Sequence, residues 1–369
     1  MIFERKDCRL CGGDLRRVLS LTPTPLANSF PDTPDKRAER YPLDLMQCLN
    51  CEHVQLSHVA DAETLYSDYK YSTPDAVKPH MRDAIANLRL LYPLAKTILE
   101  IGSNNGLYTQ MLREAGFTVV GVDPSAPEGT GTIMGYFSDV WAKWALERFG
   151  KFDLILANNV FAHINNLQAV FAGVDVLLKD DGALVFEVQY LPDMVRKGAF
   201  DMIYHEHHDY HTLSPLRRFL PRHGLVIKNY EGLPTHGGSI RVYCERPGIP
   251  LVLPREQIDW RRFKARIDLE REVCRRAITG PVVAFGATAK ATTLIHHFGI
   301  ADKIAFAVDS TPQKLGRYIP GTNIQILPES EIKDSTLFLT AWNYADVIRA
   351  KYPNPMIVPF EQQALRVAA

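Results

Sequence analysis

The sequence has no surplus of charge of either sign, because its 42 lysine and arginine residues equal its 42 aspartate and glutamate residues. Proteins that grip the nucleic-acid backbone gain much of their affinity from excess basic side chains, so this balance argues against a nucleic-acid partner. No apolar run approaches the roughly 18 residues of a membrane-spanning helix. The first residues also lack the apolar stretch of a signal peptide. We therefore expect a cytoplasmic protein without membrane contact, with a monomer as the working expectation.

Cysteine is scarce, but most of it is clustered. Four of the six cysteines form two pairs, each with a two-residue gap, and these are Cys8, Cys11, Cys48 and Cys51. This gap lets both thiolates of a pair face one ion, and two pairs complete a closed tetrahedral site. The pattern predicts a structural zinc ion; two separate surface pairs or redox dithiols are the alternatives. The nearby His53 and His58 are interpreted as surface residues rather than ligands.

Three domains are expected. Residues 1–74 contain the paired cysteines and a proline-rich stretch with little periodicity, which indicates a small, loop-rich zinc-binding domain. Residues 75–247 alternate short apolar runs with helical patterns, which is typical of a doubly wound α/β sheet. The runs at 225–230 and 239–244 are expected to close that sheet as an antiparallel pair. After a charged helix at 255–278, a second alternation predicts a smaller Rossmann-like domain over 248–369.

A glycine turn between a predicted strand and helix is the strongest cofactor signal. Gly102 and Gly106 lie in this turn, with Glu100 before it, and Asp123 ends the next predicted strand. The spacing is not the G-x-G-x-x-G of dinucleotide binding, and it is similar to the S-adenosylmethionine loop of class I methyltransferases. Glycine lets the backbone approach a ligand, and an acidic residue at the next strand end can accept both ribose hydroxyls. The expected cofactor-binding residues are Glu100, Gly102, Asn104, Gly106, Asp123, Phe137, Ser138 and Asn158.

Six of the twelve histidines lie between positions 205 and 236. Because ligands bind at the carboxyl ends of parallel strands, His163 and the segment around His207 are expected to converge beside the cofactor. Histidine and tyrosine can exchange protons with a carbon acid, so acid–base chemistry is the preferred interpretation. A second metal site, with His207 and His211 spaced by four residues, and purely structural histidines are the alternatives.

Several long motifs extend beyond these features. They are Asn158-Asn-Val-Phe-Ala-His163, Tyr204-His-Glu-His207, His236-Gly-Gly-Ser-Ile-Arg241, Gly286-Ala-Thr-Ala-Lys290 and Thr340-Ala-Trp-Asn-Tyr344. Together with the cysteine pairs and the glycine turn, they resemble the zinc-containing sugar C-methyltransferases of deoxysugar biosynthesis over essentially the whole chain. After the lysine, that family usually continues Gly-Asn-Thr, where this chain has Ala291, Thr292 and Thr293.

The resemblance implies S-adenosylmethionine in the middle domain and a nucleotide sugar between the middle and C-terminal domains. It also implies methylation at C3 of a 4-keto-deoxysugar, usually carried on dTDP. The catalytic residues that it implies are His207, Tyr204, Glu206 and His163, with Glu206 either fixing the histidine tautomer or binding a sugar hydroxyl. The expected substrate-binding residues are His236, Arg241 and Lys290.

Three other functions compete with this interpretation. Some ribosomal-RNA methyltransferases also join a zinc knuckle to this fold, although the neutral charge and the histidine cluster argue against one. A catalytically silent sugar-nucleotide-binding protein would keep the fold without the chemistry. A nicotinamide-dependent enzyme would use the C-terminal domain, but the turn after Gly286 lacks the three-glycine fingerprint.

Overall fold

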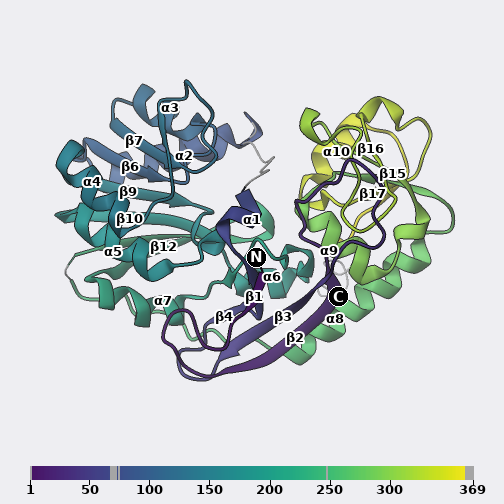
Figure 1. The fold of residues 1–369 in the computed structure, drawn as a ribbon, viewed down its shortest axis with the longest axis horizontal. Coiled ribbons are helices and arrows are strands. Elements are labelled where there is room, and N and C mark those ends of the chain that lie inside the picture. Colours follow the sequence, from purple (N-terminus) through teal and green to yellow (C-terminus); the bar gives the residue numbers. More distant parts are fainter. Residues whose placement is uncertain (1, 67–72, 74, 247, 362–369) are drawn as a thin grey trace.

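The computed structural model describes residues 2–66, 73, 75–246 and 248–361. Two α/β lobes stand apart at the top of the molecule, and antiparallel strands of the N-terminal region run beneath both (Figure 1). The described strands form sheets of two, seven, four and five strands. No helix in the described ranges is long and apolar enough to span a bilayer.

The middle lobe contains the predicted doubly wound sheet, with strand order β12-β13-β10-β9-β6-β7-β8. Its strands are β6 (Thr97–Ile101), β7 (Thr118–Asp123), β8 (Thr132–Met134), β9 (Phe152–Asn158), β10 (Leu178–Gln189), β12 (Val226–Leu233) and β13 (Ser239–Glu245). Strands β6 to β10 pair in parallel, whereas β13 runs antiparallel to β10 and β12, which confirms the expected closing pair. The central parallel strands β6, β9 and β10 are buried over most of their length, as their apolar runs indicate, whereas the edge strand β8 is not.

Helices cover the two faces of this sheet. They are α2 (Lys78–Leu91), α3 (Leu107–Glu114), α4 (Asp139–Phe149), α5 (Leu167–Leu177) and α7 (Leu213–Phe219). Helix α6 (Leu191–Lys197) instead buries its apolar residues in the core shared with the N-terminal sheet and the C-terminal lobe. Leu88 of α2 and Leu112 of α3 share one buried cluster, and Phe171 of α5 and Phe219 of α7 share another on the opposite face. This two-sided cover leaves the strand ends as the exposed edge at which ligands bind in such sheets.

The N-terminal domain has the long irregular segment that was expected, between Thr24 and Tyr41, but it also contains a sheet that was not expected. The strands are β1 (Ile2–Glu4), β2 (Leu15–Thr24), β3 (Tyr41–Cys48), β4 (Val54–Leu56) and β5 (His58–Ala60), followed by the short helix α1 (Ala62–Tyr66). Strands β2 and β3 pair antiparallel, with register shifts between Arg17 and Leu19 and between Leu21 and Thr24. These irregularities break the two-residue alternation that identifies a strand in a sequence, so the longest strand of the domain escaped detection.

The C-terminal lobe is a parallel five-stranded sheet with the order β16-β15-β14-β17-β18, as expected for a second Rossmann-like unit. Its elements are α8 (Trp260–Ala277), β14 (Val282–Phe285), α9 (Ala289–Phe298), β15 (Ile304–Val308), β16 (Ile326–Leu327), β17 (Leu337–Leu339), α10 (Ala345–Lys351) and β18 (Met356–Ile357). Helix α8 begins five residues later than expected, because the Asp259 side chain accepts a hydrogen bond from the Arg262 amide and caps it there.

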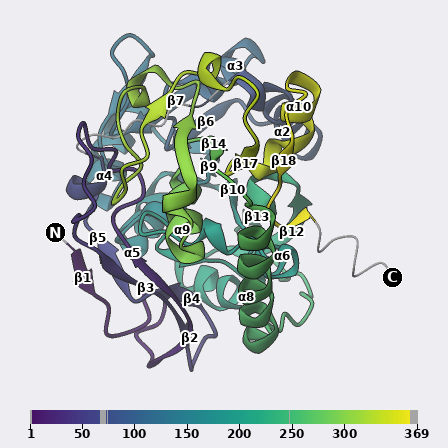
Figure 2. The same ribbon diagram turned by 90° about the vertical axis from the view of Figure 1, so that its right-hand side faces the viewer.

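One buried core joins the three regions. Leu45 of β3, Phe200 between the lobes and Phe298 of α9 belong to the same apolar cluster. The view in Figure 2 shows α8 and α9 side by side, with the N-terminal strands below α9. The segment around residue 200 is therefore packed between the N-terminal sheet and the C-terminal lobe.

Candidate active site and metal centre

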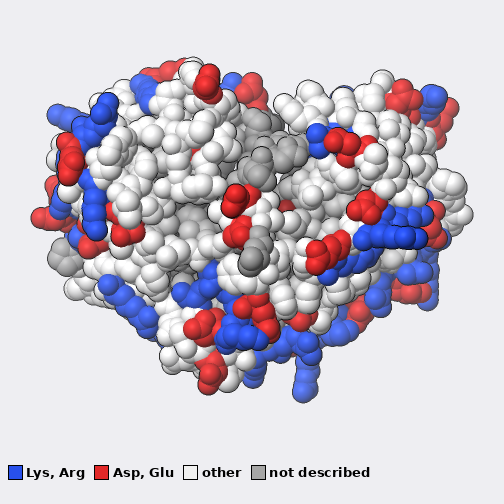
Figure 3. All heavy atoms as spheres, viewed as in Figure 1, with Lys and Arg blue, Asp and Glu red and all other residues white. Residues whose placement is uncertain are grey.

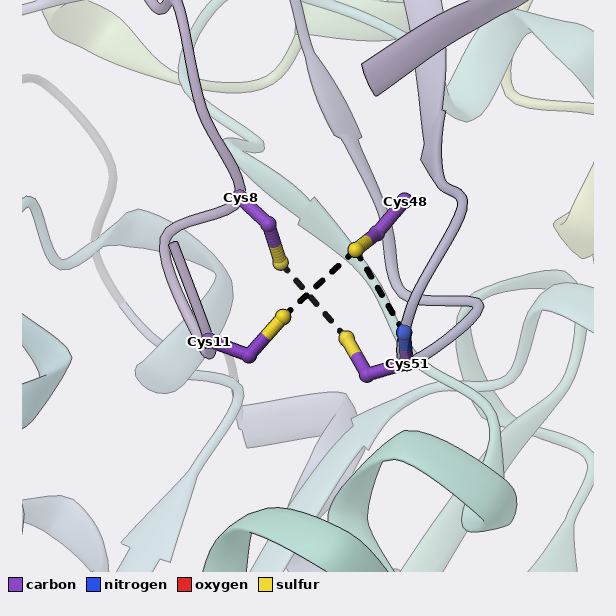
Figure 4. Close-up of side chains that lie close together, drawn as sticks. All are labelled: Cys8, Cys11, Cys48 and Cys51. Atoms are coloured by element: carbon purple, nitrogen blue, oxygen red, sulfur yellow. Dashed lines mark hydrogen bonds between the residues drawn. The ribbon is translucent and has the colours of Figure 1, made fainter. Parts of the chain in front are cut away.

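The four predicted ligands converge on one point (Figure 4). Their Sγ atoms all lie within 4.8 Å of one another. The Sγ atoms of Cys8 and Cys51 are 3.6 Å apart, and those of Cys11 and Cys48 are 3.5 Å apart. Tetrahedral zinc with bonds of about 2.3 Å requires sulfur separations of about 3.8 Å, so the set fits this ion. A hydrogen bond to the Cys51 thiol, together with burial, raises the pKa of the Cys8 thiol, which zinc overcomes by binding the thiolate.

The structure also tests two expectations about histidines, a second metal site at His207 and His211 and a surface position of His53. Among the described residues, the four cysteines form the single group of metal-ligand side chains close enough to hold an ion, so nothing supports the alternative second metal at His207 and His211. His53 is not a surface residue as expected, since it is 1% exposed and its Nε2 lies 2.7 Å from an oxygen of Asp209.

The predicted cofactor turn follows β6 and requires glycine. Gly102 has φ +75°, and a Cβ there would meet Cγ2 of Val160 at 2.3 Å. Gly106 has φ +77° and stands immediately before α3. Glu100 is buried at the end of β6, where it accepts a hydrogen bond from Thr109, and burial raises its pKa to about 7. The turn therefore brings backbone close to the strand ends, where a ligand can contact it.

Asp123 ends β7 beside this turn. Its Oδ2 accepts the Asn104 amide hydrogen at 2.9 Å, and its Oδ1 accepts the Ser125 hydroxyl hydrogen at 2.6 Å. The Ser125 amide also donates to Oδ1, at 2.7 Å, so the carboxylate is fixed in orientation and Oδ2 is the oxygen that keeps a lone pair for another donor. This geometry fits an acid that receives one ribose hydroxyl at Oδ2, and a second hydroxyl at Oδ1 would replace the Ser125 hydroxyl.

The other three predicted cofactor residues have structural contacts of their own. Phe137 is buried against Trp141, with ring centroids 5.4 Å apart. The Ser138 hydroxyl accepts the Trp141 amide hydrogen at 3.2 Å and caps α4. Asn158 ends β9, opposite Glu187 of β10. A role of these residues toward the cofactor remains a prediction.

A hydrogen-bonded tyrosine–histidine pair lies in the segment that follows η3 (Phe200–Met202). The Tyr204 hydroxyl oxygen is 2.6 Å from Nε2 of His207, and the other ring nitrogen, Nδ1, is 3.1 Å from the carbonyl oxygen of Met202. Because a carbonyl oxygen only accepts, Nδ1 carries the hydrogen and Nε2 accepts from Tyr204. Both side chains keep a little exposure, 9% for Tyr204 and 8% for His207.

His163 lies on a different loop, which follows β9 and contacts the cofactor turn. Val160, which packs on Gly102, precedes η2 (Phe161–His163). The His163 and His207 rings meet edge to face with centroids 4.7 Å apart. The His208 amide donates to the Ala162 carbonyl at 2.6 Å. The two histidines therefore converge next to the cofactor turn, as the strand-end argument predicts.

Glu206 does not contact the histidine ring, as one of its two expected roles would require. Its Oε1 accepts the Asn28 amide hydrogen at 2.8 Å, while the histidine tautomer is fixed by the Met202 carbonyl. The second carboxylate oxygen is buried and has no hydrogen-bond partner among the described residues, and burial raises the pKa of this group. Glu206 therefore does not fix the histidine tautomer, and binding of a sugar hydroxyl stays a prediction.

The three expected substrate-binding residues have different surroundings. Arg241 is buried in β13, where Glu187 and Glu231 both bind its guanidinium, so an anionic ligand would have to displace one carboxylate. Lys290 begins α9, donates to Oδ1 of Asn343 at 2.5 Å and lies 4.7 Å from the centre of the Trp342 ring. Burial lowers the pKa of Lys290. The side chain of His236 lies outside what the structure describes.

Several contacts that hold the site had no signal in the sequence. The Met202 carbonyl and the Asn28 amide are backbone groups, which any residue type could supply. The Trp342 indole donates to the buried Asp201 carboxylate at 2.6 Å, and Thr293 donates to the Ile203 carbonyl at 2.7 Å. Of these groups, Trp342 alone belongs to a quoted motif, so that motif was the one available indication.

Three family models match the chain in succession. "Putative zinc binding domain" matches residues 8–66, "Methyltransferase domain" matches residues 76–229, and "C-methyltransferase C-terminal domain" matches residues 260–356. The C-methyltransferase NovU of Streptomyces niveus is 32% identical to this chain over an alignment of 382 residues. The alignment covers 93% of this chain and 91% of NovU.

Solved structures are similar to part of the chain. The 1,6-didemethyltoxoflavin-N1-methyltransferase of Burkholderia thailandensis has a TM-score of 0.36 and 18% identity, covering 54% of this chain and 98% of its own. Magnesium protoporphyrin IX methyltransferase of Synechocystis has a TM-score of 0.35 and 17% identity, covering 48% of this chain and 90% of its own. At these scores neither structure carries an argument about function.

Proposed function

The chain belongs to the zinc-containing, S-adenosylmethionine-dependent C-methyltransferases, and from this premise we propose that it methylates C3 of a nucleotide-linked 4-keto-deoxysugar. The observation that carries the proposal is the Tyr204–His207 hydrogen bond of 2.6 Å beside the cofactor turn. A saturated sugar carbon is not nucleophilic until it loses a proton, so methyl transfer to C3 requires a base beside it. A 4-keto group supplies the acidity, because it delocalises the charge left at C3.

The pair offers a proton path in which charge stays balanced. As the C3–H bond breaks, its electrons form the C3–C4 double bond and the carbonyl electrons move to the oxygen. The Tyr204 oxygen accepts the C3 proton while its own proton passes to Nε2 of His207, which becomes imidazolium. The Met202 carbonyl, which accepts from Nδ1, stabilises that cation. His207 is thus the final base, and Tyr204 is either the relay or a donor to the enolate.

Neighbouring side chains have complementary roles. His163, whose ring contacts His207 edge to face, would donate to the enolate oxygen or orient the sugar. The unpaired oxygen of Glu206 would accept a sugar hydroxyl. Lys290, at the amino end of α9, would bind the diphosphate together with the partial positive charge of that helix end.

S-adenosylmethionine supplies an electrophilic methyl group when it is bound. The residues of this chain that would hold it are Glu100, Gly102, Asn104, Gly106, Asp123, Phe137, Ser138 and Asn158. The glycine turn would accommodate the methionine part by close backbone approach, and Asp123 would accept from the ribose.

Asp123→Ala should weaken binding of S-adenosylhomocysteine about ten- to a hundredfold, since a charge-assisted hydrogen bond contributes roughly 1.5–3 kcal/mol. Isothermal titration calorimetry measures this loss. Ser125→Ala is the matched control, because it removes the hydroxyl that donates to Asp123 but leaves the carboxylate. Equal affinity of wild type and a folded Asp123→Ala variant would show that the ribose binds elsewhere.

The sugar substrate is supported by the sequence motifs and by the surface. Basic and acidic side chains lie next to one another around the rim in Figure 3, a distribution that favours a small substrate over a nucleic acid. A dTDP-linked 4-keto-deoxysugar should release S-adenosylhomocysteine from S-adenosylmethionine, and the same nucleotide sugar with a 4-hydroxyl should not. Equal release with both sugars, or release only with RNA, would contradict the proposal.

A further inference from the structure

The catalytic segment is physically part of the zinc domain's sheet. After His207, the chain forms β11 (Asp209–Tyr210), which pairs antiparallel with β4. The Leu56 amide of β4 donates to the His208 carbonyl at 3.0 Å. The backbone one residue beyond His207 is therefore fixed by a strand that begins three residues after the last zinc ligand.

Buried charges reinforce this attachment. Asp209 is 0% exposed, and its Oδ2 lies 3.1 Å from Nη1 of Arg9, while its Oδ1 lies 2.7 Å from Nε2 of His53. Both partners belong to the knuckles, because Arg9 stands between Cys8 and Cys11 and His53 is two residues after Cys51. Burial opposes ionisation of Asp209, but Arg9 and His53 hold its pKa well below the ordinary value.

Arg9 also contacts the other half of the site. Its Nη2 donates to the Ile164 carbonyl, and to the Asn165 carbonyl at 3.2 Å. Ile164 follows His163 directly. One guanidinium fixed in a knuckle thus contacts the segment next to His163 and the segment next to His207. The guanidinium contacts both segments at once, through an ion pair at Nη1 and hydrogen bonds from Nη2, which a lysine ammonium on a flexible stem cannot do as rigidly.

We propose that Arg9 and Asp209 are positioning residues, through which the zinc knuckle sets the geometry of His163 and the Tyr204–His207 pair. The inference rests on the proposed function insofar as that pair is the base. The zinc ion then has a second consequence besides holding the N-terminal fold: it orients Arg9, and Arg9 aligns two loops from different parts of the chain. A misplacement of about 1 Å at such a site lowers turnover about 10²-fold.

The test uses the zinc-loaded full chain with Asp209→Asn, which keeps the shape and removes the charge. We expect kcat to fall about 10²-fold, with one zinc per chain and with unchanged affinity for S-adenosylhomocysteine. Amide hydrogen exchange over residues 204–211, measured without substrate, should accelerate. Arg9→Lys, which keeps the charge but not the fork, should change turnover and exchange in the same direction and serves if Asp209→Asn fails to fold.

Asp153→Asn is the matched control. Asp153 accepts from the Thr97 amide at 2.8 Å and pairs with Lys179 at 2.6 Å, near the amino ends of the middle-lobe strands. Loss of this carboxylate charge should destabilise the middle lobe but should not accelerate amide hydrogen exchange over residues 204–211. If the control accelerates exchange over 204–211 as much as Asp209→Asn does, the effect is general destabilisation and the inference fails.

A double-mutant cycle separates positioning from an independent structural role. If Asp209 acts through His207, adding Asp209→Asn to His207→Asn should lower the residual turnover by less than threefold. A further loss of about 10²-fold, or a single Asp209→Asn variant with normal turnover and normal exchange, would overturn the inference. If His207→Asn alone keeps full activity, the assignment of His207 as the base fails instead. The exchange measurement still tests whether Arg9 and Asp209 hold residues 204–211 in place.

Discussion

His207→Asn should lower kcat by about 10²–10⁴-fold, the usual contribution of a general acid–base group. The replacement is selective, because the asparagine amide can take the position of Nδ1 and still donate to the Met202 carbonyl. What it removes is Nε2, the atom that accepts from Tyr204. Turnover is measured as S-adenosylhomocysteine release under saturating substrate.

Two comparisons make this result specific. Affinity for S-adenosylhomocysteine should stay normal in His207→Asn, because the predicted cofactor residues lie on other segments. Tyr204→Phe should also reduce turnover, and a larger loss than that of His207→Asn would make Tyr204 the group that contacts C3. A loss below about tenfold in both variants would place the base elsewhere, with His163 as the next candidate.

Replacing Cys48 and Cys51 together by serine should remove zinc and unfold the N-terminal domain. Zinc contributes about 10–16 kcal/mol in small structural sites, which is as large as the whole free energy of unfolding of many domains, about 5–15 kcal/mol. Metal analysis should find no bound zinc, and hydrogen exchange should show lost protection over β2 and β3. Because β11 pairs with β4, protection of the catalytic segment should fall as well.

Cys274→Ala is the control for this experiment. Cys274 is buried in α8, where its thiol contacts Glu270 and no other cysteine, so its loss should leave one zinc per chain. Full zinc occupancy after the double replacement of Cys48 and Cys51 would contradict the assigned site. Normal protection of the N-terminal strands without zinc would contradict the structural role of the ion.

Local sequence patterns predicted the parts of the fold that depend on short-range order. Most strands of the middle lobe were detectable because each is a short apolar run bounded by turn residues, as at Thr97–Ile101. Strand β8, with three residues, was not predicted. The cysteine pairs predicted their own convergence, since a two-residue gap constrains both thiolates. The N-terminal sheet was missed because β2 departs from strand periodicity where its register shifts.

Long-range pairing explains what could not be predicted at the site. His53 had an ordinary local context, and only the fold shows that Asp209 lies against it, 156 positions further along the chain. Arg241 stood in a motif that resembled a substrate contact, yet Glu187 from a neighbouring strand binds it. The convergence of His163 and His207 was predictable, because both follow strand ends of one sheet.

The position of the new methyl group tests the central claim most directly. Wild-type enzyme, S-adenosylmethionine and a dTDP-linked 4-keto-deoxysugar should yield one product whose NMR spectrum shows a methyl group on carbon C3 and no remaining C3 hydrogen. In deuterated water with unlabelled donor, the methyl group should carry no deuterium, because it is transferred intact. A methyl group on oxygen or nitrogen, or on a carbon not adjacent to the keto group, would contradict the enolate mechanism.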